Sequence, residues 1–162
     1  MTTATAPDQT RPLYIFDLER TIALCEHRKH FLDQGGSERW RLFYAACDRD
    51  EPNAPVVRVM ETLRHNGADV WFFSGRSDEV RDKTVAWLAQ HTSFASWELD
   101  TALVMRQSHD HRPDDELKKE FLDHMLVEDR LRLVAVFDDR DRVVRMWRDN
   151  GVMCFQVAPG AF

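Results

Sequence analysis

Short apolar runs alternate along the chain with longer stretches of mixed polarity. The runs are rich in β-branched and aromatic residues, and they lie at residues 13–16, 68–73, 101–105, 131–137 and 152–157. Apolar residues fill nearly every position of these runs instead of every second one. Continuous apolar runs of this length are typical of strands covered on both faces, as in a parallel sheet.

Between the runs, apolar residues recur at helical spacing, and polar or glycine residues stand at the expected helix ends. Asn53 and Ser77 are the expected N-caps of two helices, and Asn66 with Gly67 ends the first. The apolar positions of these two helices are Val56, Val59, Met60 and Leu63, and then Val80, Thr84, Trp87 and Leu88. The pattern thus predicts one helix before and one helix after the second run.

Three further helices are predicted from the same signals. In the polar segment 25–51, Gly35 and Gly36 form a break, and Ser37 caps a helix that runs to about Cys47, followed by a turn over 48–53. Another helix covers residues 114 to about 127. The last has Val143, Val144 and Trp147 on one side and ends at Asn150 and Gly151.

Strand therefore alternates with helix, and this order predicts an α/β fold with a five-stranded parallel sheet in three layers, joined by right-handed crossovers. We find no repeat, low-complexity tract or linker that would divide the chain. The first eleven residues, MTTATAPDQTR, are small and polar. We therefore expect a flexible arm over residues 1–11 and a single domain over residues 12–162.

Composition narrows the classes of function. The chain has 162 residues, 43% hydrophobic and 31% charged, as in ordinary globular proteins, and no apolar run approaches the roughly 20 residues of a membrane-spanning helix. Its three scattered cysteines form no CxxC pair, which favours free thiols and a cytoplasmic location. The net charge of −6 argues against broad capture of duplex nucleic acid, although a few arginines could still hold one phosphate.

Three of the predicted strands end in residues that can carry chemistry. Asp17 and Glu19 follow the first strand, Ser74, Gly75 and Arg76 the second, and Asp138, Asp139 and Arg140 the fourth. Parallel strands bring these ends to one edge of the sheet. Four acids gathered there repel one another, and a hard divalent cation such as Mg²⁺ relieves that repulsion. Such a site suits phosphoryl transfer, in which an uncoordinated aspartate oxygen can be the nucleophile.

These motifs resemble those of the haloacid dehalogenase (HAD) superfamily of phosphatases. The first motif there is usually DxDGT, and here it reads DLERT; the second is a strand ending in Ser74, the third a lysine within RPDDELKKEF, and the fourth FDDRD. A closer resemblance is to the phosphatase domain of phage polynucleotide kinase 3′-phosphatase. It rests on FSGR, on the DDxxK spacing, and on the C-terminal pattern DDRxxVVxMWRxxGVxCxQVAxGxF, and it covers nearly everything from Tyr14 onward.

The resemblance implies a role for each site residue. Asp17 is the implied nucleophile and a metal ligand, Glu19 the general acid/base with a backbone carbonyl on the metal, and Asp138 and Asp139 complete the metal site. Ser74 and Lys118 would hold the phosphoryl oxygens. The implied substrate-binding residues are Thr21, Arg28, Gly75, Arg76 and Arg140. Arg28 stands 28 − 17 = 11 positions after Asp17, the spacing found in the phage enzyme.

The implied function is a Mg²⁺-dependent phosphomonoesterase that forms an aspartyl-phosphate. Its substrate would be a nucleotide or a nucleic-acid 3′-phosphate end. The insert between the first two motifs is short, so a small helical insert is expected instead of a large cap. No GxxxxGK[ST] motif occurs, so no ATP-dependent kinase activity is expected of this chain, and the oligomeric state stays open.

Glu19 and Arg20 depart from the family motif, in which aspartate and glycine are usual. One added methylene moves a carboxyl group by roughly an ångström, a displacement that can cost about a hundredfold in rate. The site is therefore either retuned or weakened. This departure motivates one alternative, a catalytically weakened binding module with the same fold. A phosphatase for another small phosphorylated metabolite is a second alternative.

Several other residues have two interpretations. His109 and His111 could be metal ligands, but no third ligand is evident, so solvated loop histidines are favoured. Cys25 has no evident activating base, which favours an inert thiol. Trp40, Phe43 and Tyr44 could stack on a nucleobase, or they could pack into the core or a lid.

Overall fold

A five-stranded parallel sheet forms the centre of the computed structural model, which describes residues 10–161. Its strands are β1 (Leu13–Phe16), β4 (Asp69–Ser77), β5 (Leu103–Arg106), β6 (Leu133–Asp138) and β7 (Cys154–Gln156), in the order β5-β4-β1-β6-β7. Every neighbouring pair is parallel. From β1 the chain continues to β4 and β5 on one side of the sheet and then crosses to β6 and β7 on the other side. The switch point, where open α/β sheets bind ligands, therefore lies at the carboxyl end of β1. The predicted fold class is confirmed.

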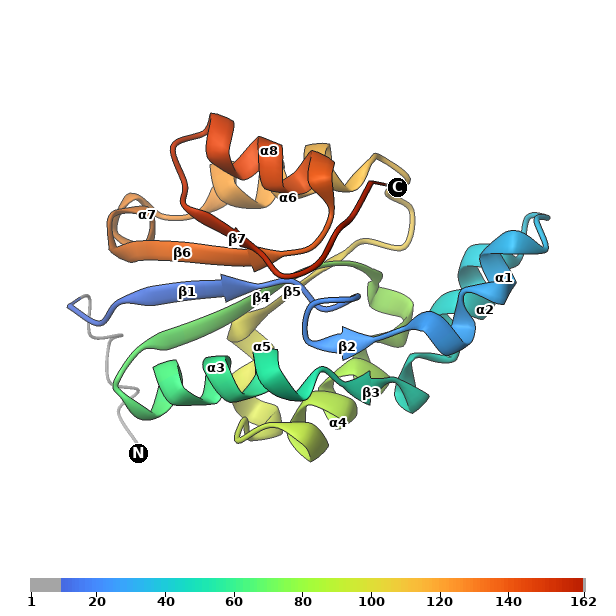
Figure 1. The fold of residues 1–162 in the computed structure, drawn as a ribbon, viewed down its shortest axis with the longest axis horizontal. Helices are drawn as coiled ribbons and strands as arrows, with labels where there is room; N and C mark the ends of the chain where they lie inside the picture. The colour runs from blue at the N-terminus through green and yellow to red at the C-terminus, as the bar shows by residue number, and fades with distance from the viewer. Residues whose placement is uncertain (1–9, 162) are drawn as a thin grey trace.

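Alternate residues of the central strands pack against opposite layers. Phe16 and Phe72 lie in the core formed with α3 (Ala54–His65), α4 (Arg81–His91) and α5 (Leu99–Ala102). Ile15 and Phe73 lie in the core on the other face, formed with α6 (Asp114–His124) and α8 (Asp141–Asp149). Figure 1 shows the two helical layers on either side of the sheet. Both faces of each strand are covered, which explains the unbroken apolar runs.

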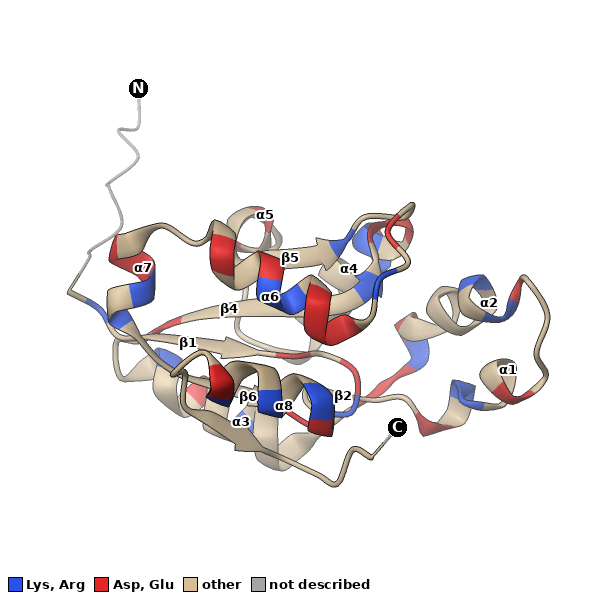
Figure 2. Cartoon of the chain, turned by 90° about the horizontal axis from the view of Figure 1, so that it is seen from above, with Lys and Arg blue, Asp and Glu red and all other residues tan. Residues whose placement is uncertain are grey.

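A small helical lobe, residues 26–49, is inserted between β1 and α3. A two-stranded antiparallel ribbon of β2 (Ala23–Leu24) and β3 (Glu51–Pro52) forms its base. The lobe contains two short 3₁₀ turns, η1 (Glu26–Arg28) and η2 (Cys47–Arg49), and the helices α1 (His30–Asp33) and α2 (Arg39–Ala45). Figures 1 and 2 show the lobe beyond the carboxyl end of β1. It is the small insert that the short spacing between motifs predicts.

Three predicted strands begin two residues later than expected; one of them is β7, which was predicted from residue 152 and begins at Cys154. The run at 101–105 starts as helix α5, and the strand begins at Leu103. The helix expected to reach about residue 127 ends at His124, and Val127–Arg132 forms a separate helix, α7, before β6 begins. Leu131 is 82% exposed, so the first apolar residue of this run does not belong to the core.

The helix ends also differ from the capping predictions. Ser37 is not an N-cap, because α2 begins at Arg39 after Glu38. The Asn53 side chain makes no cap bond and instead donates from Nδ2 to the carbonyl of Thr21, 2.9 Å away. Ser77 does accept from the backbone N–H of Glu79, although a 3₁₀ turn, η3 (Asp78–Val80), precedes α4. Val59, predicted on the apolar side of α3, is 45% exposed.

Most of the predicted N-terminal arm lies outside the described residues. Of its last residues, Arg11 donates from Nε to the carbonyl of Gly67 (2.8 Å) and lies 3.4 Å from a carboxylate oxygen of Asp69. The division into an arm and one domain stays a prediction. Within residues 10–161, no helix has both the length and the apolar character needed to cross a membrane. The three cysteines, Cys25, Cys47 and Cys154, are free and buried.

Candidate active site

The predicted site residues lie at the carboxyl ends of β4, β1 and β6, which are adjacent in the sheet. Asp17 directly follows β1, Ser74 lies in the last part of β4, and Asp138 ends β6. All three are at most 5% exposed. The backbone N–H of Asp17 donates to the carbonyl of Phe137 (2.9 Å), so sheet pairing continues to the point where the acids begin. The rigid centre of the fold therefore positions the acids.

Lys118 joins two of these acids. It lies in the second turn of α6 and is 2% exposed, and its Nζ donates to Asp17 Oδ1 (2.6 Å) and to Asp138 Oδ2 (2.7 Å). The other carboxylate oxygen of Asp138 accepts from the backbone N–H groups of Asp139 (3.0 Å) and Arg140 (3.3 Å). Asp138 is thus fixed from both sides, and Lys118 holds one oxygen of Asp17.

Asp17, Asp138 and Asp139 form a group that suits a divalent cation. Each offers a carboxylate oxygen, and these oxygens all lie within 4.8 Å of one another. Asp139 Oδ2 is buried and makes no hydrogen bond to any residue in the described range, although Arg20 Nε lies 3.4 Å away. An oxygen-only set with a buried unbonded acceptor is the donor chemistry of a hard cation such as Mg²⁺.

The charge of Lys118 does not fully offset the burial and mutual repulsion of the three aspartates. Burial raises the pKa of the Asp17 carboxyl well above its ordinary value, Lys118 lowers it, and Asp138 and Asp139 raise it further. Burial and the charge of Asp138 likewise raise the pKa of Asp139. The acids around Lys118 outweigh its burial and raise the pKa of its ammonium group. A bound cation would favour the ionised form of Asp17, the form required for nucleophilic attack.

Glu19 is held in a buried network with two arginines. Its Oε1 accepts from Arg76 Nε (2.6 Å) and from Arg28 Nη2 (3.1 Å), and its Oε2 accepts from the hydroxyl of Ser74 (3.3 Å). Arg28 and Arg76 are at most 1% exposed. Glu19 therefore connects the helical lobe, which carries Arg28, with the strand that carries Ser74 and Arg76.

Asp50 forms the other end of this network. Its carboxylate accepts from Arg28 Nε (2.7 Å) and Nη2 (2.6 Å) and from Arg76 Nη2 (3.2 Å). Its backbone carbonyl accepts from Trp87 Nε1 (2.7 Å). Two guanidinium groups thus lie between two carboxylates, and their formal charges cancel. Asp50 was not among the predicted site residues, because it lies in a polar segment without a periodic pattern.

The network determines the protonation state of Glu19. Burial alone would raise the pKa of this carboxyl, but the charges and hydrogen bonds of Arg76 and Arg28 outweigh burial and lower it to about 2. Glu19 is therefore ionised in this arrangement. To donate a proton to a leaving group it must first lose its arginine contacts, so its role as a general acid/base stays a prediction.

A second arginine pair meets at Asp114, the first residue of α6. Its Oδ2 accepts from Arg140 Nη1 (2.6 Å), and its Oδ1 accepts from Arg106 Nη2. Arg106 Nε also donates to the carbonyl of Gly75 (2.8 Å). A Cβ atom at Gly75 would lie only 2.6 Å from Asp114 Oδ1, so any other residue here would push the Asp114 carboxylate aside. Arg106 ends β5, and the strand-end reasoning that identifies Ser74 could have found it.

Arg20 and the C-terminal segment cover the acids of the fourth motif. Arg20 has φ +60°, a left-handed conformation that suits the glycine usual at this position better than a longer residue. Its Nη2 donates to the carbonyl of Pro159 (3.1 Å). A Cβ atom at Gly160 would lie 2.1 Å from the carbonyl oxygen of Asp139, so the C-terminal segment passes directly over this loop.

The other residues considered from the sequence make few or no contacts with the acids at the strand ends. Thr21 is fully buried, and its hydroxyl makes no hydrogen bond to the residues described. His109 and His111 are exposed, as expected of loop histidines. Burial, with Glu19 nearby, raises the pKa of the Cys25 thiol to about 12, as expected of an inert cysteine. The substrate-binding roles of Thr21, Arg28 and Arg76 stay predictions.

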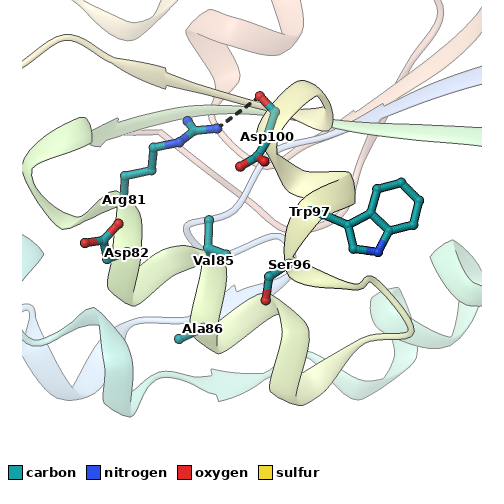
Figure 3. A pocket seen from close by; sticks show the side chains of 7 residues that line it. All are labelled: Arg81, Asp82, Val85, Ala86, Ser96, Trp97 and Asp100. Carbon is teal, nitrogen blue, oxygen red and sulfur yellow. Dashed lines mark hydrogen bonds between the residues drawn. The ribbon is translucent and has the colours of Figure 1, made fainter. Parts of the chain in front are cut away.

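A surface hollow of about 520 Å³ lies elsewhere, between α4 and the turn that leads into α5. Figure 3 shows its lining, with Trp97 at one side and Arg81 directed toward the backbone of Asp100. None of the predicted site residues lines it. The acids at the strand ends, and not this hollow, form the candidate active site.

Comparison with known proteins identifies the family. Residues 11–162 match the polynucleotide kinase PNKP phosphatase domain of HAD type. A protein of Autographa californica nuclear polyhedrosis virus, named as a candidate bifunctional polynucleotide kinase/RNA ligase, is 31% identical over 134 residues, which are 82% of this chain and 17% of the viral protein. The chain thus spans about a sixth of that relative.

Solved structures agree with this match. A chain of the Pnkp1/Rnl/Hen1 RNA repair complex superposes with a TM-score of 0.74 and 30% identity, over 99% of this chain and 47% of the other. The class C acid phosphatase from Bacillus anthracis shares the fold, with a TM-score of 0.64 and 14% identity over 93% of this chain and 67% of the other. The chain therefore belongs to the family of polynucleotide kinase phosphatase domains and is a phosphatase of the HAD fold.

Proposed function

We propose that this domain is a Mg²⁺-dependent phosphomonoesterase that removes the phosphate from a nucleic-acid 3′ end or from a 3′-phosphorylated nucleotide. One observation above all supports this proposal: Lys118 hydrogen-bonds Asp17 at the centre of three acids gathered at adjacent strand ends. The family supports the choice of a polynucleotide end, because its name describes the phosphatase domain of polynucleotide kinase.

The chemistry follows from these positions. The oxygen of Asp17 that Lys118 does not hold attacks phosphorus, and the bond between phosphorus and the sugar oxygen breaks. The leaving oxygen takes its proton from Glu19, which must first lose its arginine contacts and become protonated. Water then gives a proton back to Glu19 and attacks phosphorus of the aspartyl-phosphate, which releases inorganic phosphate and the free Asp17 carboxylate. Lys118 and the hydroxyl of Ser74 bind the phosphoryl oxygens. Asp17, Asp138 and Asp139, with the backbone carbonyl of Glu19, would hold Mg²⁺, which would supply charge neutralisation.

Substrate specificity tests the proposed function. We expect phosphate release from an oligonucleotide with a 3′-phosphate in the presence of Mg²⁺ and none in excess EDTA. An oligonucleotide of the same sequence with a 5′-phosphate is the matched control and should release little. Equal release from both ends, or release only from small phosphorylated metabolites, would contradict the proposal and support the metabolite alternative.

Thermal stability tests the metal site without reference to turnover. Binding of Mg²⁺ to the folded state raises the free energy of unfolding by about 2.7 kcal/mol when the Mg²⁺ concentration is 100 times Kd. For a domain of this size, this corresponds to a rise in melting temperature of roughly 5–11 °C. In Asp139→Asn we expect most of this rise to disappear. The melting temperature of this variant without metal should stay close to that of the parent. Asp139 Oδ2 makes no hydrogen bond to the residues described, its ion pair with Arg20 is long at 3.4 Å, and the substitution relieves its repulsion from Asp138.

The control is Asp123→Asn, which removes a carboxylate from the exposed i,i+4 pair with Lys119. This variant should keep the full response to Mg²⁺. A parent melting temperature that does not change up to millimolar Mg²⁺ would count against the metal site.

A further inference from the structure

Two aromatic side chains of α2 extend from the active site toward solvent. The hydroxyl of Tyr44 donates to the carbonyl of Gly75, 3.1 Å away, immediately after Ser74. Trp40 lies one helical turn before Tyr44, with ring centroids 5.9 Å apart and ring planes 30° apart. Because residues i and i+4 share one face of a helix, the two rings form a continuous surface that begins beside Ser74.

The base of this aromatic surface is fixed to the site. Phe43, buried next to Tyr44, has the guanidinium of Arg28 over its ring at 4.1 Å, and its carbonyl accepts from Arg28 Nη1 (3.1 Å). Arg28 in turn bonds Glu19. The position of α2 is therefore coupled to the catalytic residues, and Phe43 accounts for the packing role of this aromatic cluster.

Packing alone does not explain why a tryptophan stands at position 40. It is 44% exposed, although a tryptophan in a core would be largely covered. Arg39 beside it is also exposed, and Figure 2 shows basic residues on α2. An exposed indole next to a cation, one helical turn from a residue beside the phosphate site, is the combination used to bind single-stranded nucleic acid.

We propose that Trp40 and Tyr44 form a stacking surface for the base of the terminal nucleotide, whose phosphate lies at Asp17, Ser74 and Lys118. This inference rests on the proposed function. Stacking uses the flat face that every nucleobase presents, so the surface accepts purines and pyrimidines alike. It would give the enzyme a preference for nucleotide ends over phosphate esters without a ring, with no contact to the base edges.

The test compares two 3′-phosphorylated oligonucleotides that differ only at the last residue, which carries a base in one and is abasic in the other. The parent should have a higher kcat/KM for the end with a base, by about 5- to 150-fold, the range expected for the loss of one stacked base. In Trp40→Ala the ratio should fall toward one, chiefly through a higher KM for the end with a base. Trp40→Phe keeps a ring and should recover most of the ratio.

Leu42→Ala is the matched control, because Leu42 is 37% exposed on the same helix and lies outside the aromatic pair. It should keep the parent ratio. A parent that hydrolyses neither oligonucleotide refutes the proposed function and this inference with it. A parent that hydrolyses both, with the same ratio in Trp40→Ala as in the parent, overturns the stacking surface alone.

Discussion

Asp17→Asn is expected to lower kcat by at least about a thousandfold while the domain stays folded. Asparagine has nearly the same shape as aspartate but lacks the carboxylate that attacks phosphorus. Loss of a nucleophile usually removes almost all of the rate gained by a catalytic unit, because its other members act through it. Initial rates of phosphate release, measured with saturating Mg²⁺ and a 3′-phosphorylated oligonucleotide, give the size of the loss.

Stability should change little in this variant. Lys118 keeps its 2.7 Å bond to Asp138, and one of the mutually repelling carboxylates is removed. The control is Asp149→Asn, which removes an exposed carboxylate at the end of α8 and should leave kcat unchanged. Mass spectrometry of acid-quenched enzyme should detect a phosphorylated parent and no phosphorylated Asp17→Asn. Residual activity within tenfold of the parent would rule out Asp17 as the nucleophile.

The positions of the acids could be predicted because they depend on local patterns that continue to the strand ends. The apolar run before Asp17 and the run before Asp138 each end abruptly in acids, and the topology of a parallel sheet then brings the ends together. Lys118 required the family resemblance, since a lysine in the second turn of a charged helix has no distinctive local signal. The parallel sheet was predicted from the alternation of strands with helices and the HAD fold from the resemblance of the four motifs, and both predictions are confirmed.

Other features depend on tertiary contacts that the sequence does not reveal. Leu131 belongs to an apolar run, yet it lies exposed in α7, where Arg132 bonds Asp129 (2.9 Å) and Asp69. Asp50 has no local signal, because its partners Arg28 and Arg76 are 22 and 26 positions away. Pairing over such distances is decided by the fold, and only the folded chain identifies it.

The contacts of Glu19 give a structural role to the glutamate that stands here in place of the usual aspartate. Its carboxylate accepts hydrogen bonds from Arg28, Arg76 and the hydroxyl of Ser74. The carboxylate thereby helps to place a residue that we assign to phosphoryl binding. Glutamate in the first motif is therefore part of a network that links the helical lobe to the catalytic centre. A substitution of Asp50, at the other end of this network, tests it most directly.

Asp50→Asn is expected to destabilise the fold by about 3–5 kcal/mol, the usual cost of removing one partner from a buried ion pair. The side chains of Asp50, Arg28 and Arg76 are all fully buried. In the variant, Glu19 would be the single carboxylate facing both guanidinium groups, so one buried positive charge would lack a counterion. For a domain of this size, the loss corresponds to a fall in melting temperature of roughly 6–20 °C.

Urea unfolding of the metal-free protein, followed by fluorescence and by circular dichroism, measures this loss. Asp48→Asn is the control: Asp48 stands two positions away, its side chain is 49% exposed, and it forms a 3.6 Å surface pair with Lys83. Exposed pairs of this kind contribute about 0–1 kcal/mol, so the unfolding midpoint should shift little. Equal small shifts in both variants would show that the arginine network is not held by Asp50. A large shift confined to Asp50→Asn would show that it stabilises the lobe against the catalytic centre.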